Sequence, residues 1–419
     1  MIISKIETIR VAQFPDLIFV QVHTDTGLTG LGETWYAAAT VESAIHDHFG
    51  PLLVGRDPFE IERHWQTMFR LSDHAGYGGA ELRAISAIDV ALWDIKGQSL
   101  NMPIFEIIGG GTRNRIKVYN TLGVYGEIDE AHRVWSDPVG VAKSLLDQGI
   151  TGMKMSPTDF IARESDGQLL FQDDLDWALR PIREIREKLG MEIDIANDAH
   201  GKWNLPNAMR IVREMESMRL MWHEELISPL NEEAHRRLQA VTSTPIAAAE
   251  RLMTRYQHRR FIESSSARIS MPDLTWTGGI SEVKKIAVLA SAHQKPIAPH
   301  DCVGPVNMMA CAHIAMATPN VMIMEYNRAM HLGWYRDFIE PDFVIDGGFL
   351  MAPTEPGLGT RLKASVKARP DATVRVSSGK SESWLTSVDR YTYPPKELQS
   401  EFVHSTKRRR TGFDASYYN

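Results

Sequence analysis

From Lys117 onward, short apolar runs alternate with amphipathic stretches, and this rhythm constrains the fold more than any other feature of the chain. Eight runs fit buried strands, namely KVYNTLG, TGMKMS, EIDIAND, RLMWHEE, PIAAAE, ARISMPD, PIAPHD and NVMIMEY. Segments with helical spacing, such as LPNAMRIVREMES and SEVKKIAVLASAHQ, lie between them. Strands that alternate with helices are parallel. Eight such units in about 210 residues predict a (β/α)8 barrel of the TIM type.

The chain outside this rhythm follows other patterns. Residues 1–116 read as an α+β unit, because alternating runs around the turn DTGLTG predict antiparallel strands and ELRAISAIDVALWDIKGQSL has the apolar spacing of a helix. The barrel domain is predicted for 117–355. The segment 356–390 leaves the barrel rhythm, and 391–419 is a polar, basic stretch that we expect to be a surface tail.

Composition narrows the class of partner. The net charge of −7 argues against binding to nucleic acid. No apolar run is long enough to span a membrane and the N-terminal stretch lacks the features of a signal peptide, so we expect no membrane association. The chain has two cysteines, Cys302 and Cys311, which form no disulfide framework, and the cytoplasm is the simplest location.

Ionisable residues recur where the predicted strands end. Along the chain these residues are Lys154, Asp198 with His200, Glu224, Glu250, Asp273, His300 and Glu325. The steps from Asp198 to Glu325 are 26, 26, 23, 27 and 25 residues, and each is one strand-plus-helix unit. In a barrel of this kind the carboxyl ends of the strands carry the chemistry. The spacing therefore predicts a ring of charged side chains at one end of the barrel.

Three neighbouring carboxylates in this ring, those of Asp198, Glu224 and Glu250, would repel one another if they were uncompensated. A hard divalent cation with oxygen ligands resolves this repulsion, and Mg²⁺ suits such a set. The alternative is that these acids pair with basic residues such as Arg251. The spacing alone does not decide between the two.

The histidines offer acid–base chemistry. Asp273 and His300 lie on successive strands, and a carboxylate beside an imidazole orients the ring and favours its protonated form. His200 lies two residues after the first proposed metal ligand, from where it could reach a metal-bound substrate. Glu325 could hydrogen-bond that substrate, or be an acid of the rim. Lys154 could neutralise an anionic substrate, or only a neighbouring carboxylate.

Several motifs in this order resemble the enolase superfamily. Asp198, Glu224 and Glu250 are followed by MPD, APHD, MEYN and EPGLGTRL, and AISAIDVALWDIKGQSLNMPIFEIIGG is similar to that superfamily's capping-domain helix and the loop after it. Within the superfamily the match is to the mandelate racemase subgroup. The resemblance implies a modified (β/α)7β barrel under an α+β capping domain that is built from both chain ends, with 356–390 returning to it. It also implies Mg²⁺ on the three acids and abstraction of the proton α to a carboxylate.

This sequence departs from the family's commonest pattern at one catalytic position. KMS stands where the family often has Lys-x-Lys, so that Lys154 matches the first lysine and Ser156 replaces the second. DAH resembles the acid-sugar dehydratases of the subgroup, where this histidine is the general acid. HEEL and AAE replace the usual EEP and GE, which puts Leu226 and Ala249 next to two of the proposed ligands.

The predicted function is therefore that of a Mg²⁺-dependent acid-sugar dehydratase, a hydro-lyase with an aldonate or aldarate as substrate. His300 would be the base, oriented by Asp273, and His200 the acid, with Lys154 and Glu325 as substrate contacts. The alternatives are a racemase or epimerase of the same family and a non-catalytic relative. We expect a homo-oligomer. Residues 14–24 and about 72–80 should become ordered over a bound ligand.

Overall fold

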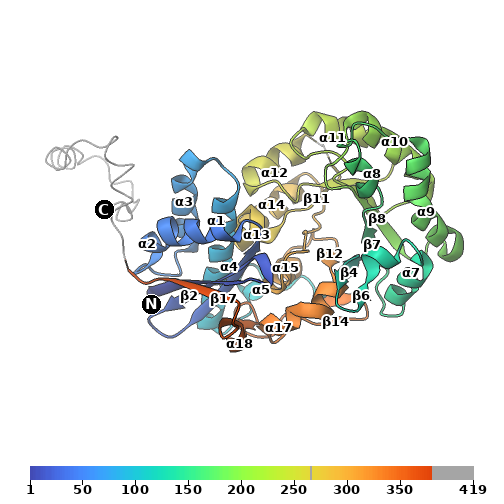
Figure 1. Cartoon of the computed structure of the whole chain (residues 1–419). Helices are drawn as coiled ribbons and strands as arrows, with labels where there is room; N and C mark the ends of the chain where they lie inside the picture. The colour runs from blue at the N-terminus through green and yellow to red at the C-terminus, as the bar shows by residue number, and fades with distance from the viewer. Residues whose placement is uncertain (265–266, 380–419) are drawn as a thin grey trace, which may run out of the picture.

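The computed structural model describes residues 1–264 and 267–379, and it has a barrel on one side and a smaller sheet with helices on the other (Figure 1). The predicted tail at 391–419 lies outside the described residues, as does the end of the predicted segment 356–390. The residue limits of the four-part division of the chain stay predictions.

The barrel is built from parallel strands in chain order. They are β4 (Arg115–Thr121), β7 (Gly152–Met155), β8 (Asp194–Asp198), β9 (Trp222–Glu224), β10 (Ile246–Ala248), β11 (Ile269–Ser270) and β12 (Met324–Tyr326). Each of the first five pairs with the next, and β12 pairs with β4. The predicted seventh strand is present only as single parallel bridges, from Ile297 to Ser270 and Val321, and from His300 to Asp273.

A helix packs behind each strand up to this seventh one. These helices are α7 (Pro138–Leu146), α9 (Gln172–Leu189), α10 (Leu205–Met215), α11 (Glu232–Gln239), α12 (Thr254–Glu263), α14 (Gly279–Ala292) and α15 (Pro305–Ala317). The chain continues from β12 into the short α16 (Arg328–Met330) rather than into an eighth barrel helix. The expected (β/α)7β architecture is thereby confirmed. Small and large apolar side chains fill the barrel interior, among them Tyr119, Ala196, Trp222 and Ala247.

The capping part is an antiparallel sheet covered by helices. Its strands β1 (Ile3–Val11), β2 (Phe14–Thr24) and β3 (Thr29–Trp35) form a meander, as the sequence predicts. β17 (Ala372–Ser377) adds to the free side of β1, so that both ends of the described chain share one sheet (Figure 1). The helices α3 (Ile61–Leu71) and α4 (Ala80–Leu100) belong to this part.

Glycine lets α4 lie directly on β3. A Cβ atom at Gly30 would come 1.9 Å from the carbonyl oxygen of Ala91, and one at Gly32 would come 1.9 Å from that of Ala87. Only a residue without a side chain allows the backbones to approach so closely. This contact holds the helix in the place from which its polar residues reach the barrel.

One expectation about the cap is wrong. Residues 14–24 are not a loop that awaits a ligand, because they form β2, which is hydrogen-bonded to β1 on one side and β3 on the other. The segment 72–80 contains a single 3₁₀ turn, Asp73–Ala75, and Gly79 N–H contacts Met253 Sδ of the barrel at 3.0 Å.

Across the described part of the chain, no helix has both the length and the apolar character needed to cross a membrane.

Candidate active site

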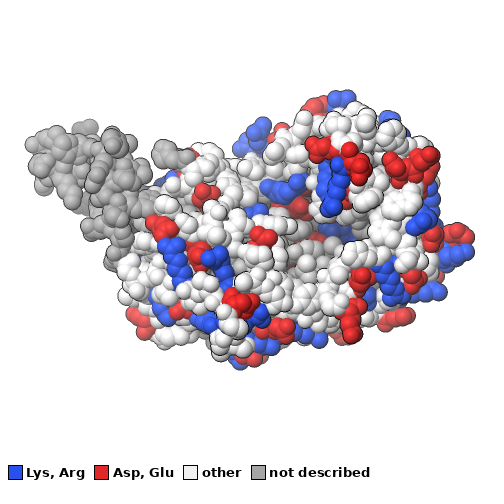
Figure 2. Space-filling view, in the orientation of Figure 1, with Lys and Arg blue, Asp and Glu red and all other residues white. Residues whose placement is uncertain are grey.

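The acidic strand ends meet at one end of the barrel. Asp198 and Glu224 are the last residues of β8 and β9 and lie directly opposite each other in the parallel register. Lys154 lies in β7 and Glu325 in β12, on either side of β4. The molecular surface is hollowed between barrel and cap, and acidic and basic atoms are visible in the hollow (Figure 2).

Lys154 is the central cation of this end. Its Nζ lies 2.6 Å from Glu224 Oε1, 2.7 Å from Glu325 Oε1 and 3.5 Å from Asp198 Oδ2. The side chain is 3% exposed. Burial alone would lower the pKa of Lys154, but Glu224 and Glu325 outweigh burial and raise it well above its usual value. Of the two roles considered for this lysine, the geometry favours neutralisation of neighbouring carboxylates.

The acids around Lys154 differ in how well they are compensated. Burial raises the pKa of Glu224 to about 8, against the lowering effect of Lys154, and Asp198 raises it further. Burial also acts on Glu325, but Lys154 and His300 bring the pKa of that residue to about 2. Glu325 is fully buried and also accepts the N–H of Asp301 at 3.0 Å, so it is not an acid of the rim.

His300 and Asp273 form the expected pair. His300 Nδ1 lies 2.7 Å from Asp273 Oδ2, and Thr275 Oγ1 donates to the other oxygen of Asp273 at 2.9 Å. His300 Nε2 faces Glu250 Oε2 at 3.5 Å. Burial lowers the pKa of His300, but Glu250, Glu325 and Asp273 outweigh this and raise it well above the usual value. The contact with Asp273 therefore orients the imidazole of His300 so that its Nε2 faces the carboxylate of Glu250.

His200 has an aspartate partner that the sequence analysis missed. Its Nδ1 lies 2.8 Å from Asp159 Oδ2, and its Nε2 lies 3.4 Å from Asp198 Oδ2. Lys202 also binds the Asp159 carboxylate. Asp159 begins the short helix α8 (Asp159–Arg163) beyond the end of β7, where neither strand alternation nor unit spacing marks it. Burial lowers the pKa of His200, but Asp198 and Asp159 raise it overall to about 9.

The third proposed ligand, Glu250, stands somewhat apart from the other two. It is 6% exposed, and Arg251 Nε lies 3.9 Å from it. Arg251 instead pairs with Glu225, to which its Nε donates at 2.9 Å. The alternative in which these acids pair with basic residues is met in part, because Lys154 pairs with Glu224 and Asp198, while Arg251 lies at the limit of ion-pair distance from Glu250. No three acid, histidine or cysteine side chains within 1–264 and 267–379 are gathered closely enough to hold a metal ion.

The donor chemistry nevertheless fits a hard cation. The site holds five carboxylates, those of Asp198, Glu224, Glu250, Asp273 and Glu325, against three bases, Lys154, His200 and His300. Two negative charges stay uncompensated when all eight groups are ionised, which matches one divalent cation. The raised pKa of Glu224 has the same origin, because burial and like charges both disfavour its ionised form.

Two family models match the sequence. "Mandelate racemase / muconate lactonizing enzyme, N-terminal domain" matches residues 6–109, and "Enolase C-terminal domain-like" matches residues 139–366. The chain belongs to this family of the enolase superfamily. The expected resemblance is thereby confirmed, and the first match covers the capping part while the second covers most of the barrel.

Named relatives of this enolase-superfamily protein agree with that assignment. It is 35% identical over 369 residues to a D-galactonate dehydratase of Variovorax paradoxus and 33% identical to one of Cronobacter sakazakii, and both matches cover 86% of this chain and 92% of the relative. The structure is similar, with a TM-score of 0.84 and 37% identity, to a crystal structure of an enolase of the mandelate racemase subgroup from Agrobacterium tumefaciens. That match covers 90% of this chain and 99% of the other.

The backbone is strained at Ala249, directly before a proposed ligand. Its φ is 95°, in the region that glycine adopts without strain, and the resemblance implies glycine at this position. Its N–H donates to Glu225 Oε1 at 2.9 Å, which anchors the strained backbone immediately before Glu250. Leu226, where the family usually has proline, is fully buried, and its carbonyl accepts the N–H of Trp203 at 3.0 Å.

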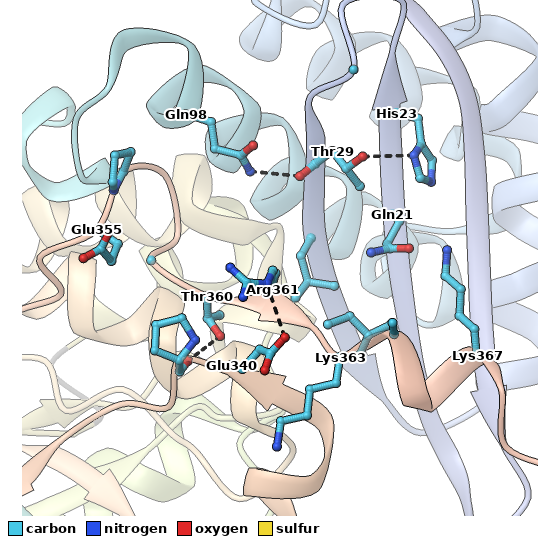
Figure 3. A pocket seen from close by; sticks show the side chains of 17 residues that line it. Gln21, His23, Thr29, Gln98, Glu340, Glu355, Thr360, Arg361, Lys363 and Lys367 are labelled. Carbon is cyan, nitrogen blue, oxygen red and sulfur yellow. Dashed lines mark hydrogen bonds and ion pairs between the residues drawn. The ribbon is translucent and has the colours of Figure 1, made fainter.

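One small cavity lies beside the proposed site, and a larger one lies away from it. A small one of about 180 Å³ is bordered by Lys154, Ser156, Thr121 and Trp135, so the serine that replaces a lysine faces open space beside the charged ring. A larger one of about 840 Å³ lies between the cap strands and residues 355–367 (Figure 3). Its lining includes none of the eight predicted site residues, and we do not assign the chemistry to it.

Proposed function

We propose that this protein is an acid-sugar dehydratase, a carbon–oxygen lyase that removes water from an aldonate or aldarate. The product is a 2-keto-3-deoxy acid. Support comes from the family membership, from the D-galactonate dehydratases among its relatives, and above all from the arrangement of the two histidines.

That arrangement is the single observation that carries the proposal. Each imidazole has its Nδ1 held by an aspartate at 2.7 or 2.8 Å, and each points its Nε2 toward one of the acids proposed as metal ligands, at 3.5 and 3.4 Å. A dehydratase needs a base for the α-proton and an acid for the departing hydroxyl. Two separately oriented imidazoles around one set of carboxylates supply both.

Asp198, Glu224 and Glu250 would hold Mg²⁺ in this proposal. Bound Mg²⁺ supplies positive charge that compensates these acids, polarises the substrate carboxylate and opposes the rise in the pKa of His300. Of the two residues expected to contact the substrate, Lys154 compensates Glu224, Asp198 and Glu325, and Glu325 is the remaining proposed substrate contact.

His300 takes the α-proton at Nε2, while Asp273 stabilises the resulting imidazolium through Nδ1. His200 gives a proton from its Nε2 to the β-hydroxyl, which leaves as water when the C–O bond breaks. The electron pair of the broken C–H bond forms the new double bond, and the enol becomes the 2-keto acid by tautomerisation. Asp198 and Asp159 raise the pKa of His200, which favours the protonated form that a general acid needs.

The racemase or epimerase alternative needs a second base on the opposite face of the α-carbon. Ser156 occupies the position of the family's lysine, and a hydroxyl without a basic partner does not remove so weakly acidic a proton. Lys154 is the remaining candidate, but its ammonium group is engaged with three carboxylates. This engagement disfavours racemisation.

The test is a screen of acid sugars for 2-keto acids, detected as semicarbazones, in the presence of Mg²⁺ and in deuterated buffer. We expect a 2-keto-3-deoxy acid with deuterium at C3. His200→Asn should block product formation while α-proton exchange persists. Substrates that return only as epimers with α-deuterium, with no keto acid, would show that the reaction is racemisation.

We also propose a cytoplasmic location and a homo-oligomeric state. Both described cysteines are free thiols, as expected of a reducing compartment. Large apolar side chains are exposed on the barrel side, among them Phe171 at 65% and Leu230 at 81%, which suits association with a second copy. Light scattering coupled to size-exclusion chromatography measures the assembly.

A further inference from the structure

Arg83 of α4 is a cation of the cap that has no acidic partner among the described residues. Its side chain is half-buried, and Nη1 donates to the backbone carbonyl of Trp35 at 2.8 Å. No carboxylate in that part of the chain lies at ion-pair distance from it, although buried charges in proteins are nearly always paired. A guanidinium has five N–H donors and no acceptor, so most of its hydrogen-bonding capacity is open to a ligand.

Two aromatic rings hold this guanidinium in place. Its central carbon lies 4.3 Å from the ring centroid of Trp276 and 5.6 Å from that of Tyr36, and the two rings lie 5.6 Å apart. Tyr36 follows β3 of the cap, whereas Trp276 belongs to α13 (Leu274–Thr277), which begins directly after Asp273. Cation–π contact orients the arginine without neutralising it.

Trp276 connects Arg83 to the proposed base. Its indole centroid lies 5.0 Å from the imidazole centroid of His300. The guanidinium carbon of Arg83 lies 4.3 Å from the Trp276 ring, so the indole contacts both groups. The indole Nε1 is buried and has no hydrogen-bond partner within the described residues. Unpaired donors on both Arg83 and Trp276 indicate a place that suits a ligand with acceptor oxygens.

Tyr36 shows backbone strain at the same place. Its φ is 72°, and that of the next residue, Ala37, is 55°. Residues other than glycine rarely adopt such angles, and they cluster at sites of function. The N–H of Tyr36 donates to the carbonyl of Asp16 at 2.9 Å, which fixes the turn. The strain keeps a half-exposed phenol beside Arg83, on the cap side of the site.

We propose that Arg83, Tyr36 and Trp276 form a distal subsite that binds the end of the substrate remote from His300, and that this end is a second carboxylate. The inference rests on the proposed dehydratase function and narrows its substrate to the aldarates. A carboxylate accepts two parallel hydrogen bonds from a guanidinium and also neutralises its charge. A hydroxyl group accepts hydrogen bonds but carries no charge.

The experiment compares a six-carbon aldarate with the aldonate of the same configuration. The wild type should have a kcat/KM for the aldarate that is about 10- to 100-fold higher, which is the effect typical of one hydrogen bond to a charged group. Arg83→Met should abolish this preference, because it should lower the kcat/KM for the aldarate more than that for the aldonate. Arg83→Lys, which keeps the charge but not the paired donors, should fall between. Arg237→Met, at an exposed arginine of α11, is the matched control.

The outcomes separate this inference from the proposed function. A wild type that dehydrates the aldonate as well as the aldarate is still a dehydratase, but it has no distal carboxylate subsite. An Arg83→Met variant that keeps the preference likewise overturns the subsite. If neither sugar yields a keto acid, the dehydratase proposal fails. In that case calorimetric binding of the aldarate to His300→Asn, with and without Arg83→Met, still tests the subsite, and equal affinities overturn it.

Discussion

Two sets of buried acids in this protein are stabilised in opposite ways. At the barrel end, Asp198, Glu224 and Glu325 surround the ammonium group of Lys154. At the boundary between cap and barrel, Glu33, Asp89 and Asp94 are each at most 1% exposed, and within the described residues none of them has a cation at ion-pair distance. Glu33, Asp89 and Asp94 accept hydrogen bonds from backbone N–H groups and a hydroxyl instead.

The cap acids bind the backbone of other segments. Glu33 of β3 accepts the N–H groups of Val306 and Asn307, at 3.1 and 2.8 Å, in the first turn of α15. Asp89 of α4 accepts the N–H and the hydroxyl of Ser281, at 3.0 and 2.6 Å, in the first turn of α14. A carboxylate at a helix N-terminus satisfies donors that the helix itself cannot.

Asp94 acts in the same way on a strand and a loop. It accepts the N–H of Leu31 at 2.9 Å and that of Leu358 at 2.8 Å, and so joins β3 to the EPGLG segment. Burial raises the pKa of Glu33 to about 8, that of Asp89 to about 7 and that of Asp94 to about 6. The comparison shows that the acids proposed for the reaction share one buried cation, while Glu33, Asp89 and Asp94 are held by neutral donors that join separate segments of the chain.

The largest expected effect lies at the barrel end. His300→Asn should reduce α-proton exchange by about 10²- to 10⁴-fold or more, because it removes the proposed general base. The thermal unfolding midpoint and the affinity for Mg²⁺ should change little. Exchange is measured by NMR in deuterated buffer. Exchange at the wild-type rate would move the base elsewhere, with Lys154 as the next candidate.

Glu224→Gln separates metal binding from folding. It should weaken Mg²⁺ binding by more than about 100-fold, since it removes one proposed ligand, and leave the circular dichroism spectrum unchanged. Calorimetric titration with Mg²⁺ measures the affinity. Glu282→Gln, at a fully buried glutamate that pairs with Arg255 outside the proposed site, is the matched control for a lost buried charge. Full metal affinity in Glu224→Gln would contradict the ligand assignment.

Glu33→Ala should show the converse pattern. It leaves two buried N–H groups without an acceptor, so the free energy of unfolding should fall by about 2–4 kcal/mol. Chemical denaturation followed by tryptophan fluorescence measures the change, and Glu33→Gln should recover part of it through its amide oxygen. Unaltered stability in Glu33→Ala would break the distinction between the two sets of acids.

A further effect is on the pH dependence of stability. Glu33 and Asp89 keep a proton in the folded state at pH values where the unfolded chain has lost it, so their contribution to stability falls as the pH rises from about 5 to their folded pKa values of about 8 and 7. Glu33→Gln lacks this loss. Its stability relative to the wild type should therefore rise steadily up to about pH 8, and that of Asp89→Asn should level off about one pH unit earlier. A constant difference across this range would contradict the raised pKa values.

Strand and unit periodicity made much of the fold and the ring of charges predictable. Each repeat of a parallel barrel ends at the same edge, so residues one repeat apart, such as Asp198 and Glu224, must lie together. The predicted strand PIAPHD is reduced to single bridges because Pro296 and Pro299 have no N–H to donate to a ladder.

The residues that contact the charged barrel end from other parts of the chain were not predictable from this periodicity. Asp159 begins the short helix α8 after β7, and Arg83 and Glu33 come from the cap, more than 200 residues away in sequence from His300. No local pattern ties such residues to their partners, since the contact exists only once cap and barrel have docked. The sequence signals the repeating scaffold and leaves these contacts to tertiary structure.

The pairing of β17 with β1 has a consequence for synthesis. A ribosome releases β1 at the start of translation, but the strand that completes its sheet follows more than 350 residues later, after the whole barrel. Until then β1 presents an open edge, and such edges invite pairing with other chains. A stop codon shortly before Ala372 would spare every residue of the proposed site and still leave that edge permanently bare, so we expect such a truncated protein to aggregate.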